Sequence, residues 1–207
     1  YKTVSTIITQ VKVDPFDPAF SNPTKVIGRY MTKEEAEAEE AKGNYVVEEP
    51  EGYRRIIAAP KPMDIYEIDA VNALLDAHQI VIAAGGGGIP VLEQRTRLKG
   101  ASAIIEKDYA AARLAELTEA DTLLFLTVYD KLTVNAGKPD ERSFENVTVA
   151  DLKPYATTGD FGPITTLPKV NAAIEFVEAG TGRKAVIANL EHAKDALLGK
   201  CGTTVTR

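Results

Sequence analysis

From residue 64 onward, the chain alternates short, wholly apolar runs with segments of helical periodicity. The runs at residues 80–84, 122–127 and 185–188 are apolar on both faces, which is typical of strands inside a parallel sheet. A parallel connection needs a crossover of a dozen or more residues, usually a helix that covers one face of the sheet. We therefore predict an α/β fold: an open, mostly parallel sheet with helices on both faces. The remaining elements expected here are helices at 64–77, 109–117, 149–155 and 167–177 and strands at 101–105 and 203–206.

An acidic segment near the N-terminus accounts for the whole net charge of the chain. The 207 residues contain 24 basic and 30 acidic side chains, and between Lys33 and Glu51 there are eight Glu and only two Lys. Residues 31–42 predict a helix that begins with a capping box, formed by Thr32 and Glu35. The net charge of −6 argues against a general nucleic-acid binder.

The segments around this acidic helix predict strands and a loop. Residues 4–13 are rich in β-branched side chains and predict a strand, whereas the proline-rich stretch 14–28 predicts a loop. Residues 44–60 predict a hairpin that turns at Glu49-Pro50-Glu51-Gly52. We expect residues 30–60 to form a small protruding α+β subdomain on a core made of residues 1–29 and 61–207. The alternative is a solvated surface excursion.

The cysteine and histidine content excludes several classes of chemistry. Cys201 is the only cysteine and cannot form an intrachain disulfide, so a reducing cytosol is the default compartment. Together with His78 and His192, it cannot supply the ligands of an ordinary structural zinc site. No run approaches the ~18 apolar residues of a membrane span. The chain opens at Tyr1 rather than Met, without a secretory signal, and we expect upstream sequence.

The strongest local motif is four consecutive glycines, Gly85 to Gly88, directly after the apolar run at 80–84. Glycines let several backbone N–H groups converge on an anion without obstruction by Cβ atoms. Neither G-x-G-x-x-G nor the P-loop pattern G-x-x-x-x-G-K-[ST] fits, because Pro90 and Cys201 occupy required positions. The motif predicts an anion-binding nest, and a purely structural strand-to-helix turn is the alternative.

Two lysines are expected at helix starts, Lys107 before the helix at 109–117 and Lys169 in the helix at 167–177. A cation at a helix N-terminus opposes the macrodipole by about 0.3–1 kcal/mol. Such lysines indicate an anion close to each, and the same helix ends can bind phosphate. Asp108 is a candidate to orient the ammonium groups, with a plain N-cap as the alternative. Either lysine taken alone can be an ordinary surface charge.

Several motifs along the chain form a recognisable set. They are Thr9-Gln10, Val13-Asp14-Pro15, Asp17-Pro18-Ala19-Phe20, Asn22-Pro23-Thr24-Lys25, Gly52-Tyr53-Arg54-Arg55, Pro60-Lys61-Pro62, the run from Ala84 to Val91, Lys107-Asp108, the run from Asn135 to Pro139, Leu167-Pro168-Lys169 and Gly202-Thr203-Thr204. Together they resemble the carbamate kinases, a family within the amino-acid-kinase superfamily, from about Val4 to Thr206. The Asp-Pro-Ala-Phe stretch and the four-glycine turn are the most specific of these motifs.

The resemblance implies reversible phosphoryl transfer between ATP and carbamate, giving ADP and carbamoyl phosphate. In fermentative organisms the family usually runs toward ATP, as the last step of the arginine deiminase pathway. The resemblance also implies a cytoplasmic homodimer, with Mg²⁺ carried by ATP or ADP rather than by protein ligands. Lys107 and Lys169 would hold the transferring phosphoryl group, Asp108 would orient them, and Lys25 would reach toward the substrate phosphate. The carbamate and phosphoryl site would be lined by Gly85, Gly86, Gly87 and Gly88, and the nucleotide would lie near Thr127, Asp130, Gly137, Lys138 and Pro139.

Some positions depart from the family's pattern. The family opens with a strand and a Gly-Gly-Asn-Ala phosphate loop that these 207 residues do not contain, so the chain as given can be inactive. Ile164-Thr165-Thr166 stands where Gly-Ser-Met is usual, and β-branched residues hinder close backbone approach to a phosphate. Smaller departures are Glu106 for Asp, Ala59 for Ser, and Val128-Tyr129 for smaller residues.

Two other functions remain open at this point. One is a non-catalytic member of the superfamily that binds nucleotide or a partner. The other is a kinase for another small carboxylate such as acetylglutamate, although the acidic segment and the Asp-Pro-Ala-Phe stretch weigh against it.

Overall fold

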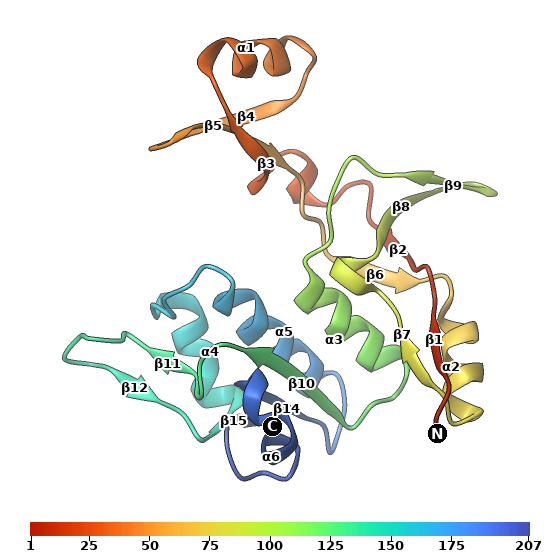
Figure 1. Cartoon of the computed structure of the whole chain (residues 1–207), viewed down its shortest axis with the longest axis vertical. Helices are drawn as coiled ribbons and strands as arrows, with labels where there is room; N and C mark the ends of the chain where they lie inside the picture. The colour runs from red at the N-terminus through yellow and green to blue at the C-terminus, as the bar shows by residue number, and fades with distance from the viewer. The chain divides into compact units, whose positions relative to one another are not determined.

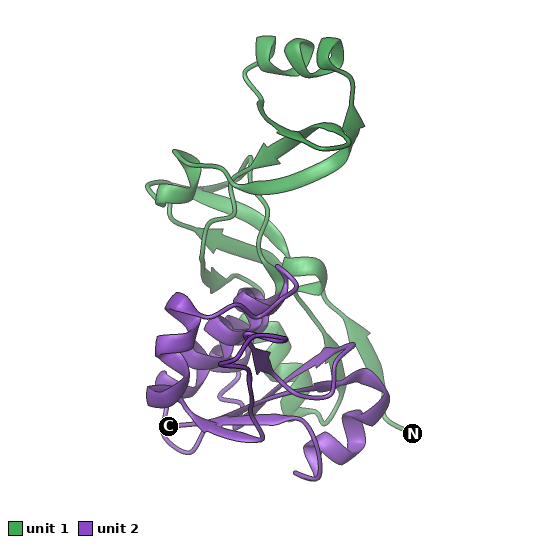
Figure 2. Cartoon of the chain, turned by 90° about the vertical axis from the view of Figure 1, so that its left-hand side faces the viewer, with its two compact units in different colours: residues 1–107 green, residues 108–207 purple.

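Parallel strand pairs occur in both halves of the chain, as the alternating sequence pattern predicts. The computed structural model describes residues 1–207, which divide into two units, residues 1–107 and 108–207 (Figure 2). Each unit combines parallel and antiparallel strand pairs with helices (Figure 1), so the predicted α/β class is confirmed. No helix combines the length with the apolar character needed to cross a bilayer.

Unit 1 contains most of the strands. Its elements are β1 (Val4–Thr6), β2 (Gln10–Val13), β3 (Lys25–Met31), α1 (Lys33–Ala41), β4 (Tyr45–Glu49), β5 (Gly52–Ile57), β6 (Pro62–Ile65), α2 (Ile68–Asp76), β7 (Ile80–Ile82), β8 (Ile89–Gln94) and β9 (Arg97–Gly100), with 3₁₀ turns at Pro18–Phe20 and Gly85–Gly87.

Within unit 1, β1 pairs with β7 in parallel, and β2 lies between β6 and β8 in a four-stranded sheet of order β6-β2-β8-β9. The pairs β2–β8 and β1–β7 are parallel, and the connection from β7 to β8 contains the four glycines. Val11, Val13, Ile65 and Val91 are buried in this sheet region. The glycine turn therefore joins two strands, not a strand and a helix as its structural alternative assumed.

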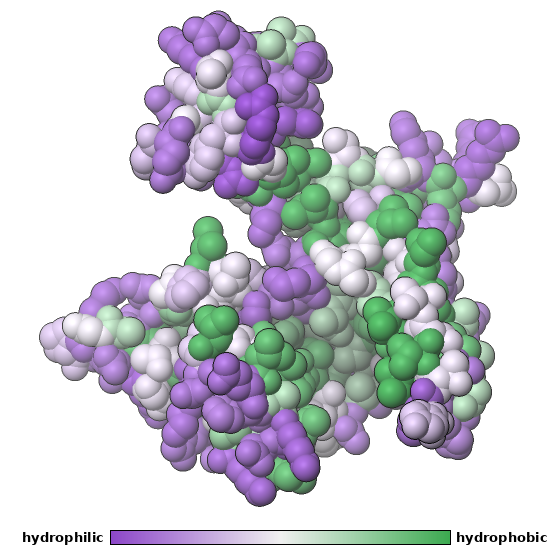
Figure 3. Space-filling model, viewed as in Figure 1, coloured by the Kyte–Doolittle hydropathy of each residue, from purple (hydrophilic) through white to green (hydrophobic).

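A three-stranded antiparallel sheet of order β3-β5-β4 lies next to α1 and forms a distinct module of unit 1, residues 25–57. The predicted capping box is confirmed: the Thr32 hydroxyl accepts from the Glu35 N–H at 3.3 Å, and the Thr32 N–H donates to the Glu35 carboxylate at 2.9 Å. The predicted hairpin is also present, with Glu49 opposite Gly52. In Figure 3 the face of this module that is visible is mainly hydrophilic, as its acidic sequence implies.

Unit 2 is built around one four-stranded sheet. Its elements are α3 (Lys107–Leu117, whose first residue belongs to unit 1), β10 (Thr122–Thr127), β11 (Thr133–Val134), β12 (Arg142–Ser143), β13 (Asn146–Thr148), α4 (Val149–Thr158), α5 (Thr166–Glu178), β14 (Lys184–Asn189), α6 (Ala193–Leu197) and β15 (Thr203–Thr206), with a 3₁₀ turn at Leu190–His192.

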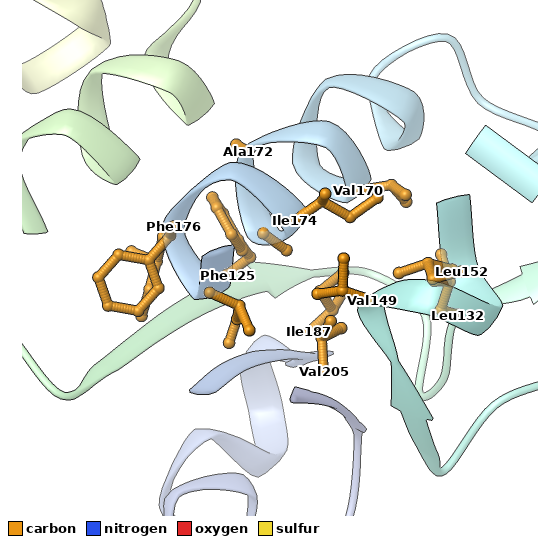
Figure 4. Packing of buried hydrophobic residues seen from close by; sticks show 14 of the residues in the cluster. Phe125, Leu132, Val149, Leu152, Val170, Ala172, Ile174, Phe176, Ile187 and Val205 are labelled. Atoms are coloured by element: carbon orange, nitrogen blue, oxygen red, sulfur yellow. The ribbon is translucent and has the colours of Figure 1, made fainter. Parts of the chain in front are cut away.

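The sheet of unit 2 has the order β10-β14-β15-β13, with parallel pairs β10–β14 and β13–β15 and an antiparallel pair β14–β15. The central strand β14 is buried on both faces. Ile187 packs into the main cluster with Phe176 of α5, as Figure 4 shows, whereas Val186 and Ala188 pack with Ala196 of α6. Helices therefore cover both faces of this sheet, which explains why the sequence of β14 is apolar throughout.

Four predicted elements differ from the observed ones. The expected strand 4–13 is two strands, because residues 7–9 leave the ladder. The expected loop contains β3, which starts after the last proline of that stretch and bulges near Gly28 at φ +74°. The expected helix 64–77 begins at Ile68, and residues 101–105 form one isolated bridge, between Ala58 and Ala103, in place of a strand.

Candidate functional site

A buried ion pair lies at the starts of two helices of unit 2. The Lys169 ammonium donates to the Asp108 carboxylate at 3.2 Å and to the Thr165 carbonyl at 3.2 Å. Lys169 is 8% exposed and Asp108 4% exposed, in the first turns of α5 and α3. Asp108 lies inside α3 and is not its N-cap. Because both charged groups are buried away from water, the ion pair between them fixes the orientation of each side chain.

The segment Ile164-Thr165-Thr166 shapes the start of α5 around this pair. Ile164 is 91% exposed and points away from the core. Thr166 is 2% exposed, and its hydroxyl accepts a long hydrogen bond of 3.4 Å from the Tyr129 hydroxyl. The contact of this segment with the Lys169 ammonium is made by a backbone group, the Thr165 carbonyl.

A cavity of about 190 Å³ lies beside Tyr129 and the start of α5. Its walls are mainly apolar and aromatic. They are formed by Tyr129, Lys131, Thr133, Ala136, Phe161, Gly162, Pro163 and Thr166. Phe161 could not be selected from the sequence, because a lone aromatic residue in a Gly/Pro-rich stretch has no distinguishing pattern.

The predicted nucleotide loop Gly137-Lys138-Pro139 lies between β11 and β12 and is tied to the segment that borders this cavity. Lys138 forms an ion pair with Asp160 at 2.9 Å, and the Asn135 N–H donates to the Asp160 carbonyl at 2.7 Å. The Lys138 ammonium, followed by the Gly162 N–H, lowers the pKa of Asp160. These bonds connect the loop that contains Ala136 to the segment that contains Phe161, and both residues line the cavity.

Thr127 and Asp130 lie at and just beyond the carboxyl end of β10. The Thr127 hydroxyl accepts from the Tyr129 N–H at 3.1 Å, and the Asn189 amide donates to the Asp130 carboxylate at 3.0 Å. Ligands of open α/β sheets bind at such strand ends. Asn189 was not predicted as a site residue, although its position directly after the apolar run at 185–188 is a signal that could have identified it.

A second cavity, of about 350 Å³, opens at the same strand ends. It is lined by Asp130, Lys131, Asn189, His192, Asp195, Lys200, Cys201 and Gly202. Lys131 borders both cavities, so the loop after β10 separates them.

The glycine turn of unit 1 contains two kinds of glycine. A Cβ at Gly87 would lie 2.2 Å from the Ile105 carbonyl oxygen, and one at Gly88 would lie 2.5 Å from Val11 Cγ2. At Gly85 and Gly86 an added Cβ would meet nothing within 4 Å. The fold therefore requires glycine at the end of the turn, and the open backbone at its start is suited to close approach by a ligand.

The remaining predicted lysines also lie in unit 1. Lys25 opens β3 and forms an ion pair with Glu106, the residue that replaces the family's usual Asp. Lys107 is the next residue, is exposed, and begins α3, two residues before the predicted start of this helix at Tyr109. The structure thus brings Lys25 to the start of α3, and Asp108 to Lys169.

Comparisons with known proteins agree on one family. A model of the amino acid kinase family matches residues 31–189. A carbamate kinase of Clostridium perfringens is 48% identical and aligns with 100% of this chain, and the carbamate kinase-like protein YqeA of Escherichia coli is 46% identical over 99% of it. Each match covers 66% of the relative, so the chain spans about two thirds of their length.

Solved structures give the same result. Carbamate kinase from Giardia lamblia bound to AMP-PNP matches 99% of this chain and 66% of its own, with 38% identity and a TM-score of 0.91.

Proposed function

The chain belongs to the amino acid kinase family, and from this premise we propose that it catalyses reversible phosphoryl transfer between ATP and carbamate. The products are ADP and carbamoyl phosphate. The relatives named carbamate kinase support this substrate over acetylglutamate. The structural observation that carries the proposal is the buried pair of Lys169 and Asp108 at two helix starts.

In this reaction a carbamate oxygen attacks the γ-phosphorus of ATP. A new O–P bond forms, and the bond from phosphorus to the oxygen that bridges the β- and γ-phosphates breaks, leaving ADP. Such transfers need little covalent help from a protein, but they need aligned reactants and positive charge around the transferring oxygens. Lysines and backbone N–H groups can supply that charge without the Cys and His chemistry that this chain barely has.

We assign the proposed roles as follows. Lys107 and Lys169 hold the transferring phosphoryl group, and Asp108 orients them. Lys25 leaves Glu106 to reach the substrate phosphate. The glycine turn, Gly85 to Gly88, lines the carbamate and phosphoryl site.

The nucleotide is proposed to bind at the carboxyl end of β10, near Thr127 and Asp130, with the cavity beside Tyr129 and the loop Gly137-Lys138-Pro139 around it. Mg²⁺ would enter with the nucleotide and offset charge on its phosphate oxygens. Asp108 is already bound by Lys169, so we assign the metal no protein ligand.

The finer expectations belong to the same proposal. They are ATP synthesis from carbamoyl phosphate in arginine fermentation, a cytoplasmic location and a homodimer. The protruding subdomain expected at residues 30–60, most of which lies in the module at 25–57, is proposed as a lid, because carbamate is labile in water and closure would exclude water.

The test is a coupled assay of ATP formation from ADP, Mg²⁺ and carbamoyl phosphate, with the mass of the purified protein measured on the same sample. Lys107→Ala should abolish ATP formation and leave the unfolding midpoint unchanged. The matched control is Lys99→Ala, which removes an exposed lysine from β9 and should retain the wild-type rate.

Three results would contradict this proposal. A near wild-type rate in Lys107→Ala would remove Lys107 from the mechanism. Binding of ADP without transfer from carbamoyl phosphate would favour the non-catalytic, nucleotide-binding alternative, and transfer to acetylglutamate alone would favour the other kinase.

A further inference from the structure

The glycine turn lies opposite a break in the neighbouring strand. The parallel pair β1–β7 ends at Thr6 and Ile82, and the parallel pair β2–β8 begins at Gln10 and Ile89. Between these pairs, residues 7–9 on one side stand opposite residues 83–88 on the other. The connection at residues 83–88 is longer than the segment at residues 7–9, so it cannot remain paired with it along its whole length. Hydrogen bonds outside the ladder are needed to hold this connection in place.

Thr9 holds both ends of this connection. Its side chain is in the interior, with the residue 4% exposed. The Thr9 hydroxyl accepts from the Ala84 N–H at 2.8 Å and donates to the Ile7 carbonyl at 3.0 Å. The Thr9 carbonyl accepts from the Ile89 N–H at 2.8 Å. The residues directly before and directly after the four glycines are therefore both bonded to Thr9.

These bonds decide how the chain enters the turn. Ala84 has a φ of +53°, a left-handed conformation that is uncommon for residues other than glycine. The first hydrogen bond inside the turn runs from the Gly87 N–H back to the Ala84 carbonyl, at 2.8 Å. The orientation of Ala84, held by Thr9, therefore sets the direction of the Gly85 and Gly86 N–H groups that follow it.

We propose that Thr9 is a positioning residue, which fixes Ala84 so that the N–H groups of Gly85 and Gly86 are aligned for a phosphoryl anion. The inference rests on the proposed function, because the anion is the phosphoryl group of that reaction. Thr9 itself touches no substrate. Its hydroxyl is used up by one backbone donor and one backbone acceptor.

The test compares Thr9→Val, which keeps the shape and removes the hydroxyl, with Thr9→Ser, which keeps the hydroxyl. The probe is inorganic phosphate, titrated while the Gly85 and Gly86 amide resonances are followed by NMR. Thr9→Val should bind phosphate roughly tenfold more weakly than wild type, because valine cannot accept the hydrogen bond from the Ala84 N–H. Thr9→Ser keeps the hydroxyl and should bind phosphate within about twofold of wild type. Val91→Ala, in the adjacent β8 core, should lose stability without losing phosphate affinity.

Turnover gives a second measurement. In Thr9→Val the KM for carbamoyl phosphate should rise while the KM for ADP stays constant, which a general loss of stability would not produce. Equal phosphate affinity in Thr9→Val and wild type would overturn the inference, as would a wild type whose Gly85 and Gly86 amides do not respond to phosphate. Phosphate binding that depends on Thr9, in a protein that forms no ATP, would support the positioning of the glycine N–H groups by Thr9 but refute the proposed function, and with it the identity of the anion.

Discussion

Alanine substitutions at Gly85 and Gly87 should separate the glycine that a ligand needs from the glycine that the fold needs. At Gly87, an added Cβ would lie 2.2 Å from the Ile105 carbonyl oxygen, and φ is +124°. Overpacking costs about 1–3 kcal/mol and an unfavourable backbone conformation costs a similar amount, so Gly87→Ala should lose about 4 kcal/mol of unfolding free energy. For a chain of this size, that loss lowers the unfolding midpoint by roughly 10 °C.

Gly85→Ala should behave in the opposite way. Its Cβ would meet nothing within 4 Å, and its φ lies outside the left-handed region. Alanine at such a position restricts the unfolded chain and stabilises the fold by about 0.4–1 kcal/mol. The same methyl group would stand between the backbone N–H groups and an approaching anion, so affinity for phosphate should fall.

Thermal unfolding and a phosphate titration, carried out on both variants, distinguish these effects. Gly100→Ala is the matched control, since Gly100 also has open space and an ordinary φ but lies at the end of β9. It should change neither the midpoint by more than a few degrees nor the affinity. If Gly85→Ala binds phosphate with the wild-type affinity, the backbone at Gly85 does not take part in anion binding. If Gly87→Ala unfolds at the wild-type temperature, the steric argument is wrong.

Two further predictions concern charge. Asp108→Asn should lower the free energy of unfolding, measured in urea, by about 3–5 kcal/mol, because it leaves the Lys169 ammonium buried without its counter-charge. Adding Lys169→Met should restore part of that loss. An Asp108→Asn variant as stable as wild type would contradict this prediction. The Arg29 guanidinium, followed by the Thr32 N–H, lowers the pKa of Glu35 to about 2. The stability that the Glu35 carboxylate contributes to the folded state is therefore present above its ordinary pKa near 4.5 and is lost as the pH falls toward 2. Arg29→Gln should raise that pKa in a carboxyl NMR titration, and an unchanged value would rule out the ion pair as the main cause.

Elements specified by local chemistry could be predicted from the sequence. The capping box of Thr32 and Glu35 satisfies two backbone donors within four residues, so it needs no tertiary information. The central strand β14 of unit 2 is apolar on both faces, and only a sheet covered on both sides buries such a segment. The helix expected at 109–117 likewise follows from its own sequence, and α3 adds two residues at its start.

Elements specified by distant partners could not be predicted in this way. Residues 25–28 belong to a stretch that predicts a loop because of its prolines, and they form part of β3 only because the distant strand β5 pairs with them. Residues 101–105 have the composition of a strand, yet they form an isolated bridge to Ala58 and no continuous ladder. At the break at residues 7–9, the Thr9 hydroxyl accepts a hydrogen bond from the N–H of Ala84, which is 75 positions away in sequence.

The candidate site shows the same division, with a consequence for its chemistry. A lysine at a helix start predicts a nearby anion, and for Lys169 that anion is Asp108, 61 residues away in sequence. A neutral buried pair delivers an ammonium in a fixed orientation, but it adds no net charge of its own. Phosphoryl transfer still needs positive potential around the equatorial oxygens. In the proposed mechanism that positive potential must come from groups that are not neutralised by a partner charge, such as the N–H groups of Gly85 and Gly86. The direction in which Thr9 holds these N–H groups should therefore affect the rate of phosphoryl transfer as well as phosphate binding.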